Sequence, residues 1–329
     1  MLQILPLFLA SGAAIYFAAE FFVNGVEWFG RRIGISETAT GTVLAAFGTA
    51  LPESAVTAAA VIFGHDAAQK DIGIGAAVGG PLVLATISYA VVGLTLALSY
   101  RRLGRADARV ASDARRLARD QGWFLAIFAA KVGLGLFAFA FKPWLGLLFL
   151  LAYAIYLRRE IGDHRGSPAP VPEPLKLHPH GEPPMWLVCL QTGIALAITA
   201  AASRVFVDQL AAFGRQVGLQ PQLAALLLSP LATEMPETMN ALIWVRQGKE
   251  RLALANISGA MMIQATVPAA LGLIFTPWLF SSSVLIAALV TIGAVLALWL
   301  LFRRGHVDGR AMIPMAGLYG VFAAAVALA

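Results

Sequence analysis

Two glutamates in an otherwise apolar chain are the residues best suited to bind a cation. Glu53 and Glu237 each lie about midway along a long apolar stretch, at the ends of the short motifs GTALPE (48–53) and ATEMPE (232–237). An ionised carboxylate in the middle of a bilayer is costly unless it is paired, protonated or bound to a cation. A single glutamate of this kind is often only a hydrogen-bonded structural residue, but two at matching positions favour a binding site.

Further oxygen atoms are expected beside both glutamates. Pro52 and Pro236 each remove one helical hydrogen bond, which predicts a kink that frees a backbone carbonyl near the glutamate. Thr49 and Thr233 lie one turn before the glutamates, on the same helix face. Carboxylate, hydroxyl and carbonyl oxygens form a flexible site suited to Ca²⁺ or Na⁺, and the absence of Cys and His from both motifs argues against Zn²⁺ and Cu⁺.

A third glutamate makes the two motifs unequal. Glu234 lies one turn before Glu237, whereas the matching residue of the first motif is Ala50. Glu234 is interpreted as a cation ligand, a proton carrier, a gate residue, or a side chain that points into a water-filled vestibule. Three carboxylates close together do not all ionise easily once a cation leaves, so a proton on one of them would allow proton-coupled exchange.

The apolar stretch after the second motif also carries polar residues. Asn256, Ser258 and Gln264 lie within LALANISGAMMIQATVP (252–268). They are expected either to form hydrogen bonds between helices or, for Gln264, to contribute to the cation site. The corresponding stretch of the first half, residues 72–86, offers almost no polar side chains.

The composition is that of a membrane protein. Of 329 residues, 59% are hydrophobic and 13% are charged, with a mean hydropathy of +0.76. Soluble domains carry about 25% charged residues, so a separate soluble domain is not expected, and neither is a nucleic-acid-binding protein. Apolar segments long enough to cross a bilayer recur along the chain. We expect ten, near residues 3–29, 36–63, 71–99, 122–140, 143–158, 185–212, 221–246, 251–275, 278–302 and 311–328.

Basic residues predict how these segments are oriented. Lys and Arg gather on the cytoplasmic side of membranes. Of the 24 Lys and Arg residues in this chain, 19 lie in connections that follow odd-numbered segments. The other five are Lys70, Lys131, Lys142, Arg204 and Arg215. We therefore expect an inner-membrane protein with both termini in the periplasm or outside the cell. The basic stretch 101–120 is interpreted as an amphipathic surface helix or a solvated loop.

An internal repeat divides the chain into halves. FFVNGVEWFGRRIG (21–34) matches VFVDQLAAFGRQVG (205–218) at an offset of 184 residues, and the same offset aligns Glu53 with Glu237. The predicted fold is an all-α polytopic membrane protein with ten transmembrane helices in two inverted five-helix repeats. Its parts are residues 1–158 with a repeat element at about 36–99, a proline-rich cytoplasmic linker at 159–184, and residues 185–329 with a repeat element at about 221–275.

These motifs resemble the cation/Ca²⁺ exchanger superfamily, which includes the sodium/calcium exchangers. That family carries two inverted repeats with a G-T-S-L-P-E signature, each followed by a G-S-N-type helix. The resemblance covers essentially the whole chain. It implies that Glu53 and Glu237 are the central Ca²⁺ and Na⁺ ligands, with Thr49 and Thr233 as their neighbours.

The sequence departs from the family pattern at several ligand positions. The family serine is replaced by Ala50 in the first repeat and by Glu234 in the second. In the following helix of the second repeat, Ala260 replaces a serine and Gln264 replaces Asn or Asp. The corresponding helix of the first repeat supplies neither serine nor amide. These changes argue against a three-Na⁺ stoichiometry, and Glu234 would shift coupling toward protons or change the transported ion.

The expected function is secondary-active antiport, most simply of Na⁺ against Ca²⁺ at a site in the middle of the membrane. The alternatives are a proton-coupled exchanger of Ca²⁺ or Na⁺ and a non-transporting membrane protein derived from an exchanger. An enzyme is not expected, because the sequence has no nucleophile constellation, metal triad or phosphate-binding loop. The predicted partners are Ca²⁺, Na⁺ or H⁺ as substrates and the lipid bilayer. No resident cofactor is expected, and the oligomeric state is not specified by these patterns.

Overall fold

The computed structural model describes residues 4–50, 57, 61–62, 67–162, 172–216, 227, 230–231, 233–305 and 307–328. Helix is the only regular secondary structure in these ranges. The first half contains α1 (Ile4–Ile33), α2 (Glu37–Ala39), η1 (Thr40–Ala45), α4 (Ala67–Val83), η2 (Leu84–Ser88), α5 (Tyr89–Ser99), α6 (Ala114–Leu136) and α7 (Lys142–Gly162). The second contains α8 (Met185–Gln216), α10 (Met235–Arg246), α11 (Glu250–Phe275), α12 (Ser282–Arg303), η3 (Gly309–Met312) and α13 (Met315–Leu328).

The helices lie where the apolar segments predict them. Each of the ten expected segments contains helix in its described residues. Within the described ranges, six helical stretches are long and apolar enough to cross a membrane: Leu5–Ile33, Gly73–Ser99, Met185–Ala202, Glu250–Phe275, Ser282–Arg303 and Gly309–Leu328. The number of membrane spans and the inverted relation of the halves stay predictions.

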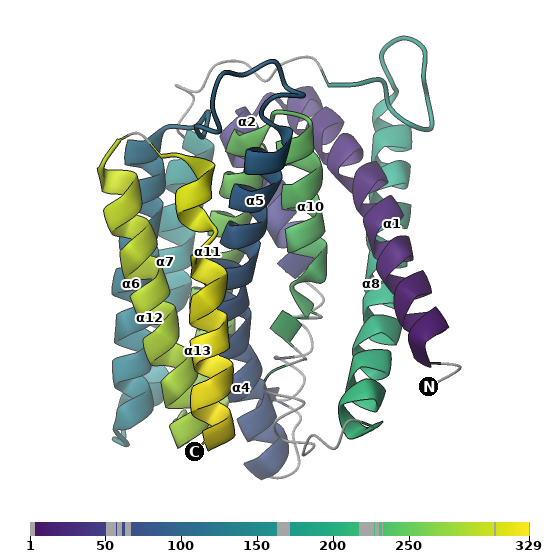
Figure 1. Ribbon diagram of the computed structural model, residues 1–329. Coiled ribbons are helices and arrows are strands. Elements are labelled where there is room, and N and C mark those ends of the chain that lie inside the picture. Colours follow the sequence, from purple (N-terminus) through teal and green to yellow (C-terminus); the bar gives the residue numbers. More distant parts are fainter. Residues whose placement is uncertain are drawn as a thin grey trace.

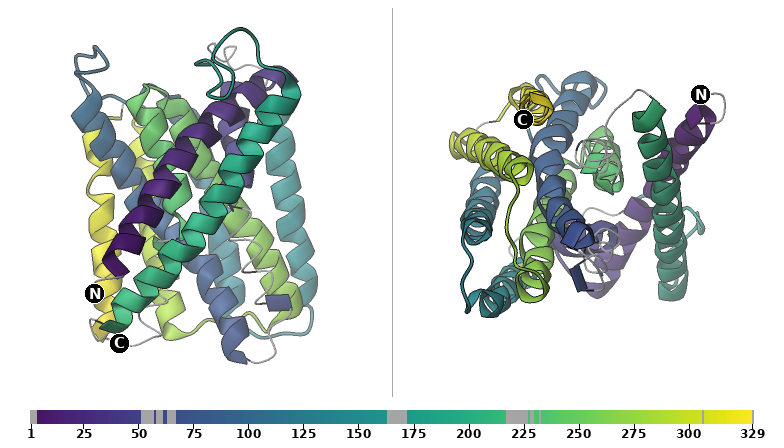
Figure 2. Two further views of the ribbon diagram at one scale, coloured as in Figure 1. Left: turned by 90° about the vertical axis from the view of Figure 1, so that its right-hand side faces the viewer. Right: turned by 90° about the horizontal axis from the view of Figure 1, so that it is seen from below.

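Two long helices form a unit at one side of the molecule. Helices α1 and α8, together called the α1–α8 pair, pack against each other along their length (Figures 1 and 2). The pair contacts the remaining helices chiefly through α10 and η1. At the centre of those helices lies α11, which packs against α7, α10, η1, α4 and α6. Most of its side chains are buried, which explains why its apolar residues occur all around the helix.

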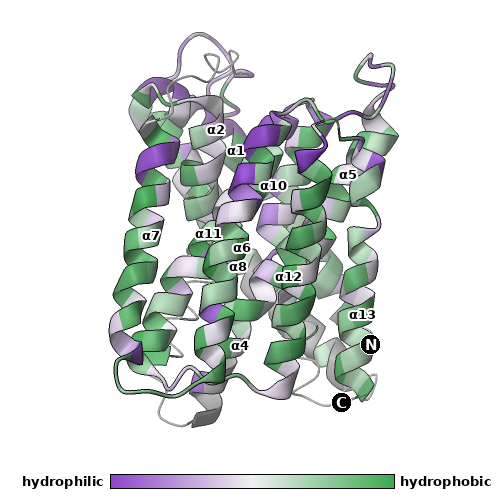
Figure 3. Cartoon of the chain, turned by 90° about the vertical axis from the view of Figure 1, so that its left-hand side faces the viewer, coloured by the Kyte–Doolittle hydropathy of each residue, from purple (hydrophilic) through white to green (hydrophobic). Residues whose placement is uncertain are grey.

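Polar residues gather at one end of the molecule, which we call the basic end. It holds the connections at 100–113, 247–249 and 304–308 and the described part of the linker, 172–184, while both chain termini lie at the opposite end (Figures 1 and 3). The common end for basic connections agrees with the pattern of Lys and Arg in the sequence. Which end faces the cytoplasm stays a prediction.

For the basic stretch 101–120, the surface-helix prediction is wrong, and the loop prediction is right only for residues 101–113. Residues 101–113 form turns and an isolated bridge between Arg109 and Asp308, whereas residues 114–120 are the first turns of α6. Asp113 caps this helix, because its carboxylate accepts hydrogen bonds from the backbone N–H groups of Arg115 and Arg116. The stretch is therefore neither a separate surface helix nor a continuous loop.

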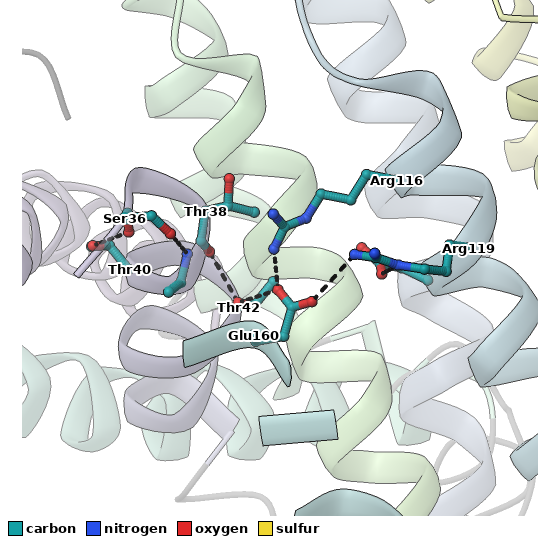
Figure 4. A network of polar contacts seen from close by, with 9 residues as sticks. Ser36, Thr38, Thr40, Thr42, Arg116, Arg119 and Glu160 are labelled. Carbon is teal, nitrogen blue, oxygen red and sulfur yellow. Dashed lines mark hydrogen bonds and ion pairs between the residues drawn. The ribbon is translucent and has the colours of Figure 1, made fainter. Parts of the chain in front are cut away.

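A buried glutamate of α7 binds two of the arginines in the first turns of α6. Glu160, near the end of α7, is 2% exposed and accepts hydrogen bonds from Arg116 of α6 and from Thr42 of η1, the latter at 3.1 Å (Figure 4). Arg119 lies 3.8 Å from the same carboxylate. Tertiary partners thus stabilise arginines that the local pattern assigns to solvent. The network holds α6, α7 and η1 together at the basic end.

The linker is partly folded against the α1–α8 pair. The indole N–H of Trp28 and the amide of Asn24, both in α1, donate to the backbone carbonyl of Glu173 at 2.8 and 3.2 Å. Gln191 of α8 donates to Asn24 Oδ1 at 3.0 Å and accepts from the backbone of Leu177 at 2.9 Å. The described part of the linker is therefore attached to this pair by buried hydrogen bonds.

Candidate cation site

The second glutamate motif lies at a break between helices. Helix α10 begins at Met235, with Pro236 in its first turn, and Glu234 precedes it with φ −87° and ψ 4°. Residues 230–231 and 233 are also helical, and the backbone N–H of Glu234 bonds to the carbonyl of Pro230 at 3.0 Å. The interruption at Glu234, two residues before Pro236, agrees with the predicted kink. Proline is tolerated in the first turn because the backbone N–H groups there have no helical acceptor. The break places Glu237 in the first turn of α10, where the helix dipole favours a negative charge.

Both carboxylates of this motif are buried. Glu234 is 0% exposed and Glu237 is 1% exposed. The Nε2 of Gln264, on α11, donates a hydrogen bond of 2.9 Å to Glu234 Oε1. Two acidic side chains of α10 and its N-terminal extension thus lie inside the helix bundle rather than at its lipid surface. The hydrogen bond also brings Gln264, an expected site residue, directly to the carboxylate.

The first half contributes a hydroxyl to the same region. The Oγ1 of Thr238 donates to the carbonyl of Glu234 at 2.9 Å and lies 2.7 Å from the Oγ of Ser88, in η2. Because the single hydroxyl proton of Thr238 goes to Glu234, Ser88 must donate to Thr238. Sequence reasoning missed Ser88, which lies two residues beyond the polar-poor stretch 72–86 and is a common residue with no motif around it.

A buried lysine approaches the site from α6. Lys131 is 0% exposed, and its Nζ donates to the carbonyls of Ala77 in α4 at 2.8 Å and of Gln264 in α11 at 3.2 Å. In the sequence, Lys131 is visible only as a single positive charge inside an apolar run, which does not indicate its partners. Lys131 and Glu234 are therefore connected through one residue, Gln264.

The two expected threonine ligands share one hydrogen-bonding pattern. Thr49 donates its hydroxyl proton to the carbonyl of Ala45 at 3.0 Å, and Thr233 donates to that of Pro230 at 3.3 Å. A hydroxyl that donates its proton to a carbonyl of its own helix keeps both lone pairs, which can bind a cation. Thr49 is buried and Thr233 is partly buried. Both oxygens are chemically suited to coordinate a cation.

Two residues at matching positions of the repeat, Ala46 and Pro230, each pack against a glycine of the other half. A Cβ atom on Gly79 of α4 would lie 2.6 Å from the ring of Pro230, and one on Gly259 of α11 would lie 2.8 Å from the Cβ of Ala46. Ala46 and Pro230 are matched by the same offset of 184 residues that aligns the glutamates. Glycine permits close approach of the helices at both crossings.

Asn256 of α11 is fully buried and lies beside Gly41 of η1. Neither of its side-chain polar atoms has a hydrogen-bond partner within the described part of the chain. Ser258 behaves as expected for an interhelical contact, since its Oγ lies 3.2 Å from the hydroxyl of Tyr89 in α5. The interhelical hydrogen bond that was one expectation for Asn256 is therefore not seen within the described residues.

The described part of the chain contains only some of the predicted site. Glu234, Glu237 and Gln264 are buried, with Gln264 bonded to Glu234. Glu53, with the rest of the first motif beyond Ala50, lies outside the described residues. Within the described ranges, no three His, Cys, Asp or Glu side chains form a group that could hold a metal ion. The coordination of an ion by Glu53 and Glu237 together stays a prediction.

Comparisons with known proteins agree on one family. The sequence profile described as sodium/calcium exchanger protein matches residues 4–161 and 187–328. The inner membrane protein YrbG of Escherichia coli strain K12 is 26% identical over 306 residues, which cover 90% of this chain and 88% of YrbG. The putative antiporter CaxA of Alkalimonas amylolytica is 25% identical over 268 residues, which cover 80% of this chain and 78% of CaxA.

A solved structure has the same fold. The sodium-calcium exchanger NCX_Mj, soaked with 10 mM Na⁺ and zero Ca²⁺, superposes with a TM-score of 0.76 over 99% of this chain and 100% of that one. The two sequences are 21% identical. The helical architecture is therefore shared although most side chains differ.

Proposed function

The chain belongs to the sodium/calcium exchanger protein family, and we propose that it exchanges Ca²⁺ for Na⁺ by alternating access at a site formed by Glu53, Glu237 and their neighbours. It is a multi-pass membrane transporter of that family. The observation that carries the proposal is the burial of Glu234 and Glu237 at a helix break inside the bundle. Buried carboxylates in a membrane are stabilised by a bound cation, and helix breaks near the midplane are where transporters bind ions.

The chemistry of the donors supports a hard cation. The candidate ligands are the carboxylates of Glu237, Glu234 and Glu53 and the hydroxyls of Thr49 and Thr233, all of them oxygen atoms. The amide oxygen of Gln264 would complete the set once its nitrogen has bonded Glu234. Ca²⁺ accepts six to eight oxygen ligands in flexible geometry, and Na⁺ uses similar donors.

The packing of the α1–α8 pair supports a sliding mechanism. This pair contacts the other helices mainly through α10 and η1, the elements adjoining the two glutamate motifs. Movement of the pair across α10 and η1 would expose the site first to one side of the membrane and then to the other. We propose that the basic end faces the cytoplasm of a cell with this protein in its inner membrane, with both termini on the far side.

A second candidate is proton-coupled exchange of Ca²⁺ or Na⁺. The specific observation that favours it is Glu234, a fully buried acid at a position where the family signature has serine. When the cation leaves, a proton on this group would lower the charge of the empty site.

Flux measurements separate these possibilities. Purified protein in sealed liposomes should accumulate radiolabelled Ca²⁺ when an outward Na⁺ gradient is imposed. Uptake driven only by an outward H⁺ gradient would select the proton-coupled candidate. Absence of uptake of any alkali or alkaline-earth ion with either gradient would reject antiport altogether.

Substitutions then test the site. Glu237→Gln and Glu53→Gln should each abolish exchange while the protein stays monodisperse and keeps its melting temperature within a few degrees. The matched control is Glu182→Gln, because Glu182 lies in the linker with a side chain that is 68% exposed and 3.6 Å from Arg32. It should transport as the wild type does. Full activity in either site variant would remove that residue from the proposal.

A further inference from the structure

Lys131 is a buried charge that the proposed exchange does not use. Its side chain lies in α6 with 0% exposure, in the apolar run 123–136. A lysine in the interior of a membrane protein is costly and is normally held in place by specific partners. Here the Nζ bonds two backbone carbonyls, those of Ala77 and Gln264, and lies 4.7 Å above the ring of Phe128.

The position of the ammonium group resembles that of a bound monovalent cation. Backbone carbonyls are the ligands that replace water around alkali cations in proteins. The two carbonyls come from α4 and α11, the helices that follow the two glutamate motifs in the sequence. The ammonium therefore uses oxygen atoms of both halves next to the candidate site.

The contacts of Gln264 connect the positive charge of Lys131 to the negative charge of Glu234. The backbone carbonyl of Gln264 accepts a hydrogen bond from Lys131, and its side-chain amide donates one to Glu234. Glu234 is the carboxylate that the family signature lacks, and Lys131 lies on the other side of Gln264. One added negative charge is thus accompanied by one fixed positive charge in the same chain of contacts.

We propose that the ammonium of Lys131 is a tethered cation, which takes the place of one transported monovalent ion and balances Glu234. The inference rests on the proposed function, since it concerns the ions bound at that site. With Glu53, Glu234 and Glu237 ionised and Lys131 protonated, the net charge is two negative, which one Ca²⁺ neutralises. Buried sites favour neutrality because uncompensated charge is strongly disfavoured in a low dielectric.

A purely structural role is the competing explanation, and the chain supplies its matched control. Lys142, in the first turn of α7, also has a buried side chain whose Nζ donates to three carbonyls, those of Phe137, Pro277 and Trp278, at 2.7, 2.8 and 2.8 Å. These carbonyls lie at the chain connections opposite the basic end, and none belongs to the candidate site residues. Lys142→Met therefore removes a comparable buried ammonium without changing the charge of the site.

The first measurement is the number of monovalent ions bound. Equilibrium binding of radiolabelled Na⁺ to purified protein in detergent should show one more Na⁺ per molecule in Lys131→Met than in the wild type. Lys142→Met should bind the wild-type number. An unchanged number in folded Lys131→Met would overturn the proposal. If that variant does not fold, Lys131→Gln takes its place, because the glutamine amide can still donate to a carbonyl.

The second measurement is a rescue that a structural role would not produce. Glu234→Gln should weaken Ca²⁺ binding by about tenfold or more, since one attractive charge is lost from a buried site. Adding Lys131→Met should restore the affinity to near the wild-type value, because the net charge returns to two negative. A double variant that binds Ca²⁺ more weakly than Glu234→Gln alone would overturn the inference and identify Lys131 as a structural link between helices.

The outcomes for the two proposals are distinct. Failure of the wild type to exchange ions across liposomes rejects the proposed antiport. The tethered cation is judged only by differences in Na⁺ number and Ca²⁺ affinity among variants. A wild type that binds Ca²⁺ without exchanging it would still answer the question about Lys131.

Discussion

A buried ion pair joins the α1–α8 pair to α10 and α11, and its removal should change which orientation of that pair is populated. Glu27 of α1 accepts hydrogen bonds from Trp244 Nε1 at 2.8 Å and from Lys249 Nζ at 2.8 and 2.6 Å. Trp244 lies in α10, and Lys249 directly precedes α11. If the pair slides during exchange, these bonds must break in every cycle. Glu27→Gln should therefore destabilise the orientation seen in this structure.

The size of the effect follows from the geometry. Hydrogen bonds to charged groups contribute about 1.5–3 kcal/mol, against about 1 kcal/mol for neutral ones. Glutamine keeps the bond to Trp244 but replaces the charged contacts with Lys249 by a neutral one. The Lys249 side chain is 18% exposed, so water screens part of the charge. We expect a loss of about 2 kcal/mol, which corresponds to a shift of about thirtyfold in the equilibrium.

The shift can be measured as a change of distance populations. Spin labels at Leu9 of α1 and Leu289 of α12, both well exposed, report the position of the pair when Cys189 has been replaced by serine. Glu27→Gln should populate a second distance that the wild type hardly shows.

The control is Glu20→Gln on the same helix. The carboxylate of Glu20 lies 3.7 Å from Nζ of Lys176, which belongs to the linker that is bonded to the α1–α8 pair. Its loss should leave the distances unchanged. Lys249→Met should act like Glu27→Gln, and the double variant should add little, because both changes break one interaction. Distance populations of Glu27→Gln that match the wild type would refute the reasoning.

Three further predictions concern packing, pH and the linker. Gly259→Ala should lower the melting temperature, with a loss of about 1–3 kcal/mol from overpacking against the backbone of Thr42 and the side chain of Ala46, whereas Gly75→Ala, where a Cβ meets open space, should not. Burial, followed by the nearby Glu160, raises the pKa of Asp120 to about 7. Between about pH 4 and pH 7, the Asp120 carboxyl is protonated in the folded protein but ionised in the unfolded chain. The free energy of unfolding therefore falls as the pH rises through this range. Asp120→Asn should accordingly raise the melting temperature more at about pH 8 than at about pH 5, and an equal effect at both would contradict the assignment. Asn24→Ala should speed proteolysis within residues 172–184, because the side chain holds the carbonyl of Glu173 and the backbone of Lys176; unchanged cleavage would show that these bonds do not hold the linker.

The sequence predicts the helices well because bilayer-crossing helices need long apolar runs, and those runs are visible in one dimension. It predicts the helix ends less well, because these depend on partners elsewhere in the chain. The first turns of α6 carry Arg115, Arg116 and Arg119, which local rules assign to solvent. Asp113 is a local cap signal for that segment, but the ion pair of Arg116 with Glu160, 44 residues away along the chain, is not visible in the sequence.

The same distinction applies to the candidate site. Glu234, Glu237 and Gln264 are conspicuous because polar residues are rare in apolar runs, and all three are buried in the bundle. The contacts that combine them are invisible in the sequence. Ser88 and Lys131 are bonded to Thr238 and to Gln264 across 150 and 133 residues of chain. The proline predicts an interruption before α10 but not that it falls at Glu234, because a proline pattern alone does not distinguish a bent helix from the first turn of a new one.

In the proposed exchange, the charge of the site would also prevent leak. A site with three carboxylates and one fixed ammonium carries two uncompensated negative charges when empty, and moving them past the apolar helices of the membrane would be costly. If the α1–α8 pair slides as proposed, it would pass over the site at low cost only when a divalent cation, or monovalent ions of equal total charge, occupies it. Release of Ca²⁺ on one side must then be followed by binding of counter-ions before the pair returns. Under this proposal the combined charge of Glu53, Glu234, Glu237 and Lys131 would make antiport obligatory, with no separate gate required to enforce it.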